Sequence, residues 1–80
     1  MYLEIITPEK IIFEGEINRV RVPGAMGSFE VLKKHAPIIS ILEAGSIKIV
    51  GVDGYDQYIQ IKGGVIEVKN NKVIILAENP

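Results

Sequence analysis

Isoleucine and valine dominate the apolar part of this chain and constrain its fold more than any other feature. They number 23 of the 80 residues, whereas leucine and alanine number four each. β-Branched side chains lose rotamer freedom in helices and pack well on pleated strands. A helical domain of this size would need the leucine and alanine that are scarce here. The eight glycines and four prolines fall between the apolar clusters, so the composition predicts an all-β domain.

Alternation with a period of two residues divides the chain into nine short predicted strands. Val20 and Val22, for example, alternate with two arginines, which is typical of a half-buried strand. The predicted strands cover residues 2–7, 11–13, 16–22, 28–33, 38–42, 46–52, 57–62, 65–69 and 72–77. Strands repeating at about eight residues indicate one domain over residues 1–80, a small β-sandwich or flattened barrel of about nine to ten short strands.

Turn-forming residues separate these predicted strands. Asp53-Gly54 predicts a hairpin of type I′, and Asn70-Asn71 predicts another tight turn because asparagine tolerates the left-handed conformation. Residues 23–27, which include a Pro-Gly pair and a second glycine, predict a turn. Gly15 ends a strand, and Gly63-Gly64 predicts a bulge or a sharp turn.

The composition excludes several classes of function. The chain has no cysteine and one histidine, His35, which excludes disulfides, thiolate ligands and multi-histidine metal sites. A net charge of -1 and few aromatic residues argue against a nucleic-acid-binding surface. The carboxylates are scattered and no Gly-x-Ser-x-Gly motif is present, so we expect no catalytic residues, metal or cofactor. No apolar run approaches the roughly 18 residues of a membrane span, and no signal peptide is visible.

Apolar residues exceed what one buried face per strand requires. Adjacent apolar pairs would place side chains on both faces of a strand, and these are Ile5-Ile6, Ile11-Ile12, Ile38-Ile39, Ile41-Leu42 and Ile74-Ile75-Leu76. The mean hydropathy of +0.26 is high for a small soluble monomer. Exposed apolar patches usually mark contacts between proteins. The residues alone therefore predict an all-β interaction module and leave its partner open.

An ordered set of motifs resembles one known family. The set runs through Leu3–Glu9, Ile12–Glu16, Val20–Gly24, Gly27–Leu32, His35–Pro37, Gly45–Ile49, Ile61–Val68 and Asn71–Ala77. In this order, with His-Ala-Pro in the middle and Gly-Gly-x-x-Glu-Val near the end, it resembles the amino-terminal domain of the epsilon subunit of bacterial F-type ATP synthases. The resemblance covers all 80 residues.

The resemblance implies a function. A family member is a non-catalytic subunit of the central stalk, or rotor, of the proton-translocating ATP synthase. It binds the gamma subunit and the c-ring, couples proton flow to ATP synthesis, and lies peripherally at the cytoplasmic face of the bacterial inner membrane. Gamma would cover part of the surplus apolar surface. The alternative is a free-standing all-β adaptor unrelated to ATP synthase, and a small-molecule-binding barrel is a third possibility.

The resemblance also implies contact residues. The c-ring contact is expected at Met26, Gly27, Ser28, Phe29, Glu30 and His35. The gamma contact is expected at Thr7, Ala36, Pro37 and Ser40. From the residues alone, His35 has a second interpretation, in which it fixes the bend before Pro37 through local hydrogen bonds.

The C-terminus carries a further expectation about regulation. Most relatives continue into a pair of helices that inhibits ATP hydrolysis and in some bacteria binds ATP, whereas this sequence stops at Pro80. A reach of about 30 Å needs about 20 helical residues, and only three residues follow Ala77. We therefore expect no C-terminal helical hairpin, no inhibition by helix extension and no nucleotide bound by this chain. Whether Pro80 is the native end stays open at this point.

Overall fold

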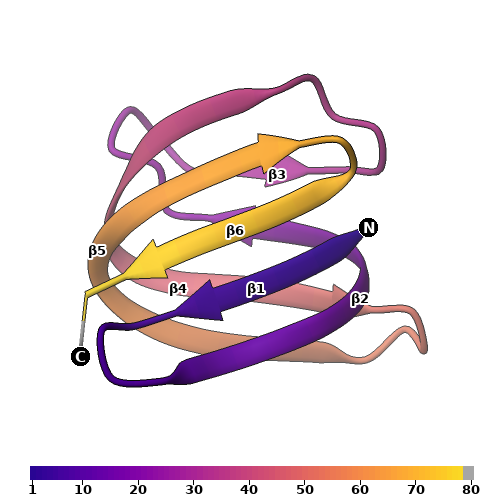
Figure 1. The fold of residues 1–80 in the computed structure, drawn as a ribbon, viewed down its shortest axis with the longest axis horizontal. Coiled ribbons are helices and arrows are strands. Elements are labelled where there is room, and N and C mark those ends of the chain that lie inside the picture. The colour runs from indigo at the N-terminus through magenta and orange to yellow at the C-terminus, as the bar shows by residue number, and fades with distance from the viewer. Residues whose placement is uncertain (79–80) are drawn as a thin grey trace.

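The computed structural model describes residues 1–78, which form six β-strands and no helix (Figure 1). The strands are β1 (Tyr2–Ile6), β2 (Ile11–Val22), β3 (Phe29–Val31), β4 (Ile38–Gly51), β5 (Asp56–Lys69) and β6 (Lys72–Ala77). They are hydrogen-bonded in the order β1-β6-β5-β4-β2-β3, and an additional pairing of β1 with β2 closes the sheet on itself. The prediction of an all-β flattened barrel is confirmed.

The long strands each belong to both halves of the barrel. Residues 38–43 of β4 pair with residues 63–68 of β5, beside β6 and β1. Residues 45–50 of β4 pair with residues 56–61 of β5, and this half continues into β2 and β3. In Figure 1, β4 and β5 curve from one half into the other, and β1 and β6 lie side by side across the front. The parallel β1–β6 pair is the single parallel pairing among the described residues.

The predicted count of nine to ten short strands is wrong. The predicted strands 11–13 and 16–22 are one strand, β2, and the same is true of 38–42 with 46–52 in β4 and of 57–62 with 65–69 in β5. Glycine lies at each of these three junctions, at Gly15, Gly45 and Gly63-Gly64. These glycines bend a continuous strand around a corner of the barrel, whereas the sequence pattern predicted a strand end at Gly15, a connection between strands at Gly45 and a bulge or a sharp turn at Gly63-Gly64.

Backbone geometry explains why the corners require glycine. Gly63 has φ +153° and Gly64 has φ +157°, values that residues with a side chain rarely adopt. A Cβ at Gly64 would also collide with the carbonyl oxygen of Leu76 on β6. At Gly15, with φ +154°, a Cβ would meet nothing within 4 Å. Gly64 is therefore constrained by both conformation and packing, and Gly15 by conformation alone.

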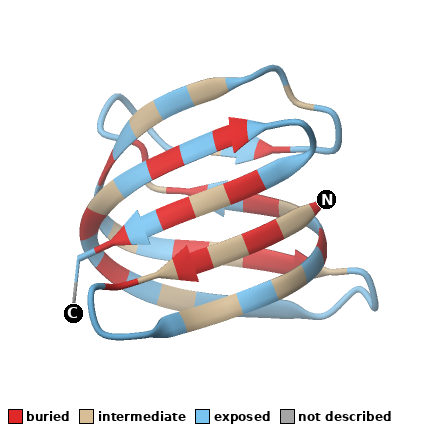
Figure 2. Ribbon diagram, in the orientation of Figure 1, coloured by how far each residue is buried: buried red, intermediate tan, exposed pale blue. Residues whose placement is uncertain are grey.

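The core lies between the two halves and consists almost entirely of Ile, Val and Leu. Buried and exposed residues alternate along β5 and β6 (Figure 2), as the period-two pattern predicted. The largest fully buried side chains are Leu3, Ile5, Ile17, Ile47, Ile49, Ile61, Ile66, Ile75, Val20, Val22, Val31 and Val68. Phe13, Phe29 and Ile59 are half-buried and pack against this cluster.

The turns partly follow the sequence predictions. Asn70 and Asn71 have φ 52° and 61° and join β5 to β6 as a two-residue turn, which confirms the tight turn. The type I′ hairpin at Asp53-Gly54 is wrong, because only Gly54 has a positive φ there. The loop instead spans residues 52–55, with a hydrogen bond from Gly51 N–H to Tyr55 O at 3.0 Å and Gly54 as its left-handed residue. The expected absence of a helical hairpin after Ala77 concerns Asn79 and Pro80, which lie outside the described residues.

Candidate functional site

One outer face of the barrel is apolar. Outward-facing side chains of β1, β6, residues 63–69 of β5 and residues 38–43 of β4 form it, and we call it the apolar outer face. Its members are Ile6, Ile39, Ile41, Val65, Ile74 and Leu76. Ile39 is 73% exposed, Ile41 67% and Leu76 55%. The cross-strand register places Val65 directly between Ile41 and Leu76, so these side chains form one contiguous patch.

Three shallow hollows follow this face from one end to the other. The first, of about 440 Å³, is lined by Ile6, Thr7 and Pro8 together with Val65 and Leu76. The central hollow, of about 220 Å³, lies among Ile39, Val65, Glu67, Ile74 and Leu76. The third, of about 470 Å³, is lined by Pro37, Ile38, Ile39, Glu67, Val68 and Lys69. The apolar outer face therefore extends from the β1–β2 turn to the segment that precedes β4.

The opposite outer face is polar, and its side chains are paired with one another. We call it the polar outer face, formed by outward-facing residues of β2, β3, β4 from Gly45 on, and β5 before Gly63. Arg19 Nε lies 3.2 Å from Glu30 Oε2, and Lys48 Nζ lies 3.6 Å from Asp56 Oδ2. Ser46 Oγ donates a hydrogen bond to Gln60 Oε1 at 2.7 Å. Charge is therefore balanced locally on this face.

Three of the four residues predicted to contact gamma lie at the ends of the apolar outer face, and Ser40 lies on β4 between Ile39 and Ile41. Pro37 is exposed and borders the third hollow, beside exposed Ala36. Thr7 lines the first hollow but is only 4% exposed, and its Oγ1 accepts a hydrogen bond from Lys10 N at 3.2 Å. Ser40 is half-buried and pairs with buried Ile66, so its side chain lies on the inner side of the strand. The sequence analysis thus named the ends of this face and omitted Ile39, Ile41, Val65 and Leu76 between them.

The residues predicted to contact the c-ring fall into two groups, one on each side of β3. Met26, Gly27 and Ser28 form an exposed turn that leads into Phe29 and Glu30 of β3. Met26 is 101% exposed, and Arg21 Nη2 donates a hydrogen bond to Ser28 Oγ at 3.1 Å.

His35 is separated from this turn by β3 and lies in the loop of residues 32–37 (Figure 1). Its Nδ1 lies 2.7 Å from the carbonyl oxygen of Ala36, and its backbone N–H donates to Leu32 O at 3.1 Å. These contacts are local, which agrees with the interpretation that His35 fixes the bend before Pro37.

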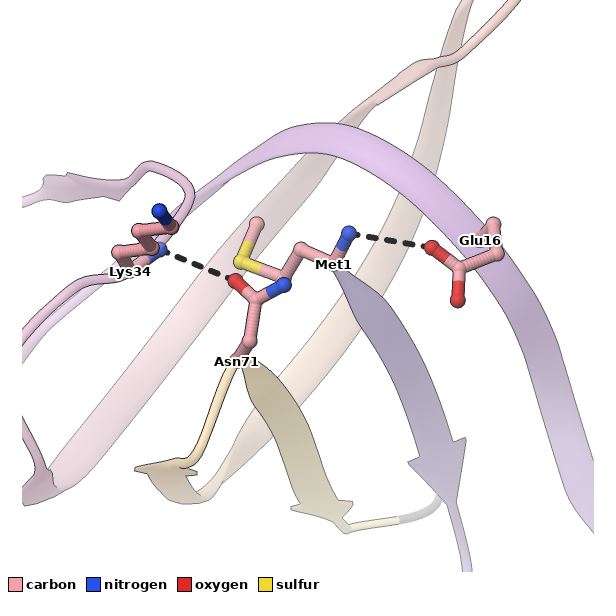
Figure 3. Close-up of polar contacts among 4 residues, drawn as sticks. All are labelled: Met1, Glu16, Lys34 and Asn71. Atoms are coloured by element: carbon pink, nitrogen blue, oxygen red, sulfur yellow. Dashed lines mark hydrogen bonds and ion pairs between the residues drawn. The ribbon is translucent and has the colours of Figure 1, made fainter.

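Asn71 attaches the loop of residues 32–37 to the rest of the barrel. Lys34, with φ 60°, donates its backbone N–H to Asn71 Oδ1 at 3.0 Å (Figure 3). The carbonyl oxygen of Asn71 accepts a hydrogen bond from Tyr2 N at 3.2 Å, and the amine of Met1 pairs with Glu16 at 3.1 Å nearby. The bond to Asn71 thus joins the loop of residues 32–37 to the β5–β6 turn, 37 residues further along the chain. Nothing in the sequence indicates this contact beyond the turn-forming asparagine.

A small polar cluster surrounds Tyr2 at the end of β1. Tyr2 Oη donates a hydrogen bond to Glu14 Oε2 at 3.3 Å, and Lys72 Nζ lies 3.5 Å from Glu4 Oε1. The Lys72 ammonium also lies 5.7 Å from the centre of the Tyr2 ring. Partial loss of hydration, and then the charge of the neighbouring carboxylates, chiefly that of Glu14, raise the pKa of the Tyr2 hydroxyl above its ordinary value of 10.0.

Neither a metal cluster nor a membrane-spanning helix is found in the part of the chain that the structure describes. No group of three or more His, Asp or Glu residues among residues 1–78 is placed to hold a metal ion. The same residues contain no helix long and apolar enough to cross a membrane.

Known proteins share this sequence pattern. Residues 1–79 match the family model described as "ATP synthase, Delta/Epsilon chain, beta-sandwich domain". The chain is 46% identical over 76 residues to the ATP synthase epsilon chain of Chlorobaculum tepidum, covering 95% of this chain and 86% of that protein. It is 40% identical over 78 residues to the epsilon chain of Campylobacter fetus subsp. fetus, covering 98% of this chain and 60% of that one.

Solved structures share the fold. A chain of the Euglena gracilis mitochondrial ATP synthase, in a structure of OSCP, F1 and the c-ring, superimposes with a TM-score of 0.88 at 21% identity and covers 94% of this chain. A chain of the Tetrahymena thermophila central stalk and c-ring superimposes with a TM-score of 0.79 at 21% identity. This chain spans 48% and 63% of the length of those two chains. The family match over residues 1–79 and the identity to curated epsilon chains show that this chain belongs to the family of the ATP synthase delta/epsilon chain beta-sandwich domain.

Proposed function

We propose that this chain is a non-catalytic subunit of the central stalk of a proton-translocating F-type ATP synthase. In this role it binds gamma and the c-ring, rotates with them and couples proton flow to ATP synthesis at the cytoplasmic face of the bacterial membrane. Membership of the epsilon family supports the proposal. The single observation that carries it is the apolar outer face, because exposed apolar surface on one side of a small domain is typical of a subunit interface.

Gamma is the partner that we assign to the apolar outer face. Side chains that are more than half exposed, such as Ile39 and Ile41, each gain roughly 1 kcal/mol when a partner removes them from water. The face ends at Thr7 on one side and at Pro37 on the other, which the family resemblance implies as gamma contacts. The proposed gamma contact therefore comprises Thr7 at one end, Ala36 and Pro37 at the other, and the apolar outer face between them, with Ser40 on β4 within that span.

The c-ring contact is proposed for the turn and β3, at Met26, Gly27, Ser28, Phe29 and Glu30, with His35 on the far side of β3. The exposed turn can approach another backbone closely because Gly27, at φ +120°, lets the chain reverse tightly. Glu30 is held by Arg19, so its carboxylate is oriented at the edge of the sheet. The division by β3 makes the contribution of the turn and that of His35 separable by experiment.

Co-purification with the partners tests the function. The full chain is expressed with gamma and the c-ring of the same organism, and we expect it to elute with them in a constant ratio. A chain that stays monomeric and never associates with either partner would show that the proposed function is wrong.

Single cysteines test the c-ring contact. Ser28→Cys is expected to crosslink to c-subunit loops in the assembled complex, and His35→Cys shows whether the contact extends past β3. Gln60→Cys, on the polar outer face, is the matched control and is expected to give no crosslink. Absence of crosslinks from both Ser28→Cys and His35→Cys would show that the proposed c-ring contact is wrong, and it would not bear on the proposed gamma contact.

A further inference from the structure

One carboxylate, that of Glu67, lies within the apolar outer face and has no hydrogen-bond or ion-pair partner among residues 1–78. Glu67 is exposed on β5 and pairs across the strands with Ile39 on one side and Ile74 on the other. It lines the central hollow and the hollow beside Pro37. No hydrogen bond or ion pair to its side chain is found among residues 1–78.

The charged residues closest to Glu67 on its face do not neutralise it. Lys69 lies two residues further along β5, on the same face, and forms no ion pair with Glu67. Lys72, on the neighbouring strand, pairs with Glu4 at 3.5 Å. The carboxylate is therefore stabilised by water, which any partner seated on this face must displace.

The fold does not require a charged side chain at position 67 within the motif that contains Glu67. In Gly-Gly-Val-Ile-Glu-Val, the two glycines form the corner, and Ile66 and Val68 are buried in the core. Val65, like Glu67, faces outward, and it continues the apolar patch. In the isolated chain, an apolar residue at position 67 would form the same strand equally well. We therefore look for the role of the Glu67 charge in contact with another molecule.

We propose that Glu67 determines the specificity of the apolar outer face, and that the surface covering this face presents a lysine or arginine side chain to the Glu67 carboxylate. The inference rests on the proposed function, in which gamma is the covering partner. A carboxylate buried without a counter-charge strongly disfavours binding, whereas a lysine or arginine forms short charge-assisted hydrogen bonds with it. Apolar surfaces without a suitably placed cation are thereby rejected.

The experiment compares Glu67→Leu, Glu67→Gln and the unsubstituted full chain for binding to gamma. Glu67→Leu enlarges the apolar outer face, so it would strengthen binding to a partner that is purely apolar there. We expect the opposite: both variants bind gamma about tenfold more weakly, as when one partner of an interfacial charge pair is lost. The unsubstituted chain should lose affinity with added salt more steeply than either variant, since only it retains the charge pair.

Controls separate the possible failures. Gln60→Leu adds the same side chain on the polar outer face and should bind gamma as the unsubstituted chain does. The midpoint temperature of thermal unfolding of the Glu67 variants should be unchanged or slightly higher, because the Glu67 side chain forms no hydrogen bond or ion pair within residues 1–78 that could be lost.

Binding of Glu67→Leu equal to or tighter than that of the unsubstituted chain would overturn the inference and leave the proposed function intact. Failure of the unsubstituted chain to bind gamma would overturn the proposed function itself, and the inference with it. Where binding is weakened, Glu67→Lys is combined in turn with gamma variants in which a single lysine or arginine is replaced by glutamate. One such combination should restore the affinity, and it identifies the cation on gamma.

Discussion

The two outer faces of this barrel share the long strands β4 and β5 but differ in chemistry. Before Gly45, β4 presents Ile39 and Ile41 to the outside, and after it the same strand presents Ser46 and Lys48. Apart from Ser40, the inward-facing residues of β4 stay apolar on both sides of the corner. Folding therefore requires only the inward-facing pattern, and the outward-facing pattern reports what each face touches. The corner glycines, which bend the strands, also mark the boundary between the two surfaces.

The energetics of the two faces differ in the same way. The ion pairs of the polar outer face join side chains that are more than a third exposed, so each adds at most about 1 kcal/mol to stability. These pairs form in the isolated chain and need no covering partner. The apolar outer face keeps its side chains in contact with water and gains only when another surface covers it. Four substitutions, each with a matched control, test this difference. They lie at a corner glycine, on the apolar outer face, and at two positions on the border of that face, and they follow in order of decreasing expected effect.

The largest effect is expected from Gly64→Ala, at the corner that joins the two faces. The added Cβ collides with the backbone of Leu76 and the residue must keep φ near +157°, so unfolding should require at least ~3 kcal/mol less free energy. Gly15→Ala is the matched variant, with a similar φ of +154° but open space around the Cβ, and should cost about 1 kcal/mol. Urea denaturation measures both. Equal losses would mean that conformation alone, and not packing against β6, constrains Gly64.

A charge placed on each face in turn tests which one binds gamma. Ile41→Asp puts a carboxylate at the centre of the apolar outer face and should weaken binding to gamma about 100-fold, since a buried unpaired charge costs several kcal/mol. Gln60→Asp makes the same residue on the polar outer face and should change the affinity less than twofold. Isothermal titration calorimetry measures both affinities. Similar losses in the two variants would show that binding does not discriminate between the faces.

The loop at one end of the apolar outer face is expected to depend on a single side chain. Asn71→Gly keeps the positive φ of the turn but removes the acceptor for Lys34 N–H. Loss of one exposed hydrogen bond of about 1 kcal/mol should speed exchange of the Lys34 amide about fivefold. Asn70→Gly changes the neighbouring turn residue and leaves that acceptor in place. Hydrogen exchange followed by NMR compares them, and equal exchange rates would show that Asn71 does not hold the loop.

The smallest effect concerns Tyr2, at the far edge of the apolar outer face. Its pKa in the folded chain lies above the ordinary value of 10.0, so the unfolded chain loses this proton first as the pH rises. The contribution of Tyr2 to stability is thus fully present below pH 10.0 and is lost as the pH rises through the folded pKa. Tyr2→Phe should reduce the decrease in the free energy of unfolding at alkaline pH. Tyr55→Phe, in the exposed β4–β5 loop, should leave this decrease unchanged. Urea midpoints measured from about pH 9 to about pH 11 decide between them.

Sequence reasoning located the strand segments and the apolar surplus but not their continuity. Ile74-Ile75-Leu76 was assigned to both sides of a strand, and Ile75 is indeed buried while Leu76 is 55% exposed. Alternation is a local property, so it can be read without knowing the fold. The predicted strands stopped at Gly15, at Gly45 and at Gly63-Gly64, the last of which was predicted as a bulge or a sharp turn, because glycine occurs both in turns and at barrel corners. Only the hydrogen bonds to neighbouring strands distinguish the two.

The candidate site shows the same division. The family resemblance implied Thr7, which directly follows β1, and Pro37, which directly precedes β4, without indicating that one continuous face joins them. That face forms because β6 inserts between β1 and β5, in parallel with the first and antiparallel with the second. Glu67 acquired its significance in this arrangement, since its isoleucine neighbours come from β4 and β6.

The sequence by itself determined the all-β class, the inward-facing core and the excess of apolar side chains, because these follow from β-branched composition and a period of two residues along the strand. Tertiary structure alone decided which outward-facing residues share a surface, which glycines bend a strand, and which charges have partners. These properties depend on the register between strands that are distant in the chain. Register is set by closure of the whole sheet, to which β1, β6, β5, β4 and β2 contribute together.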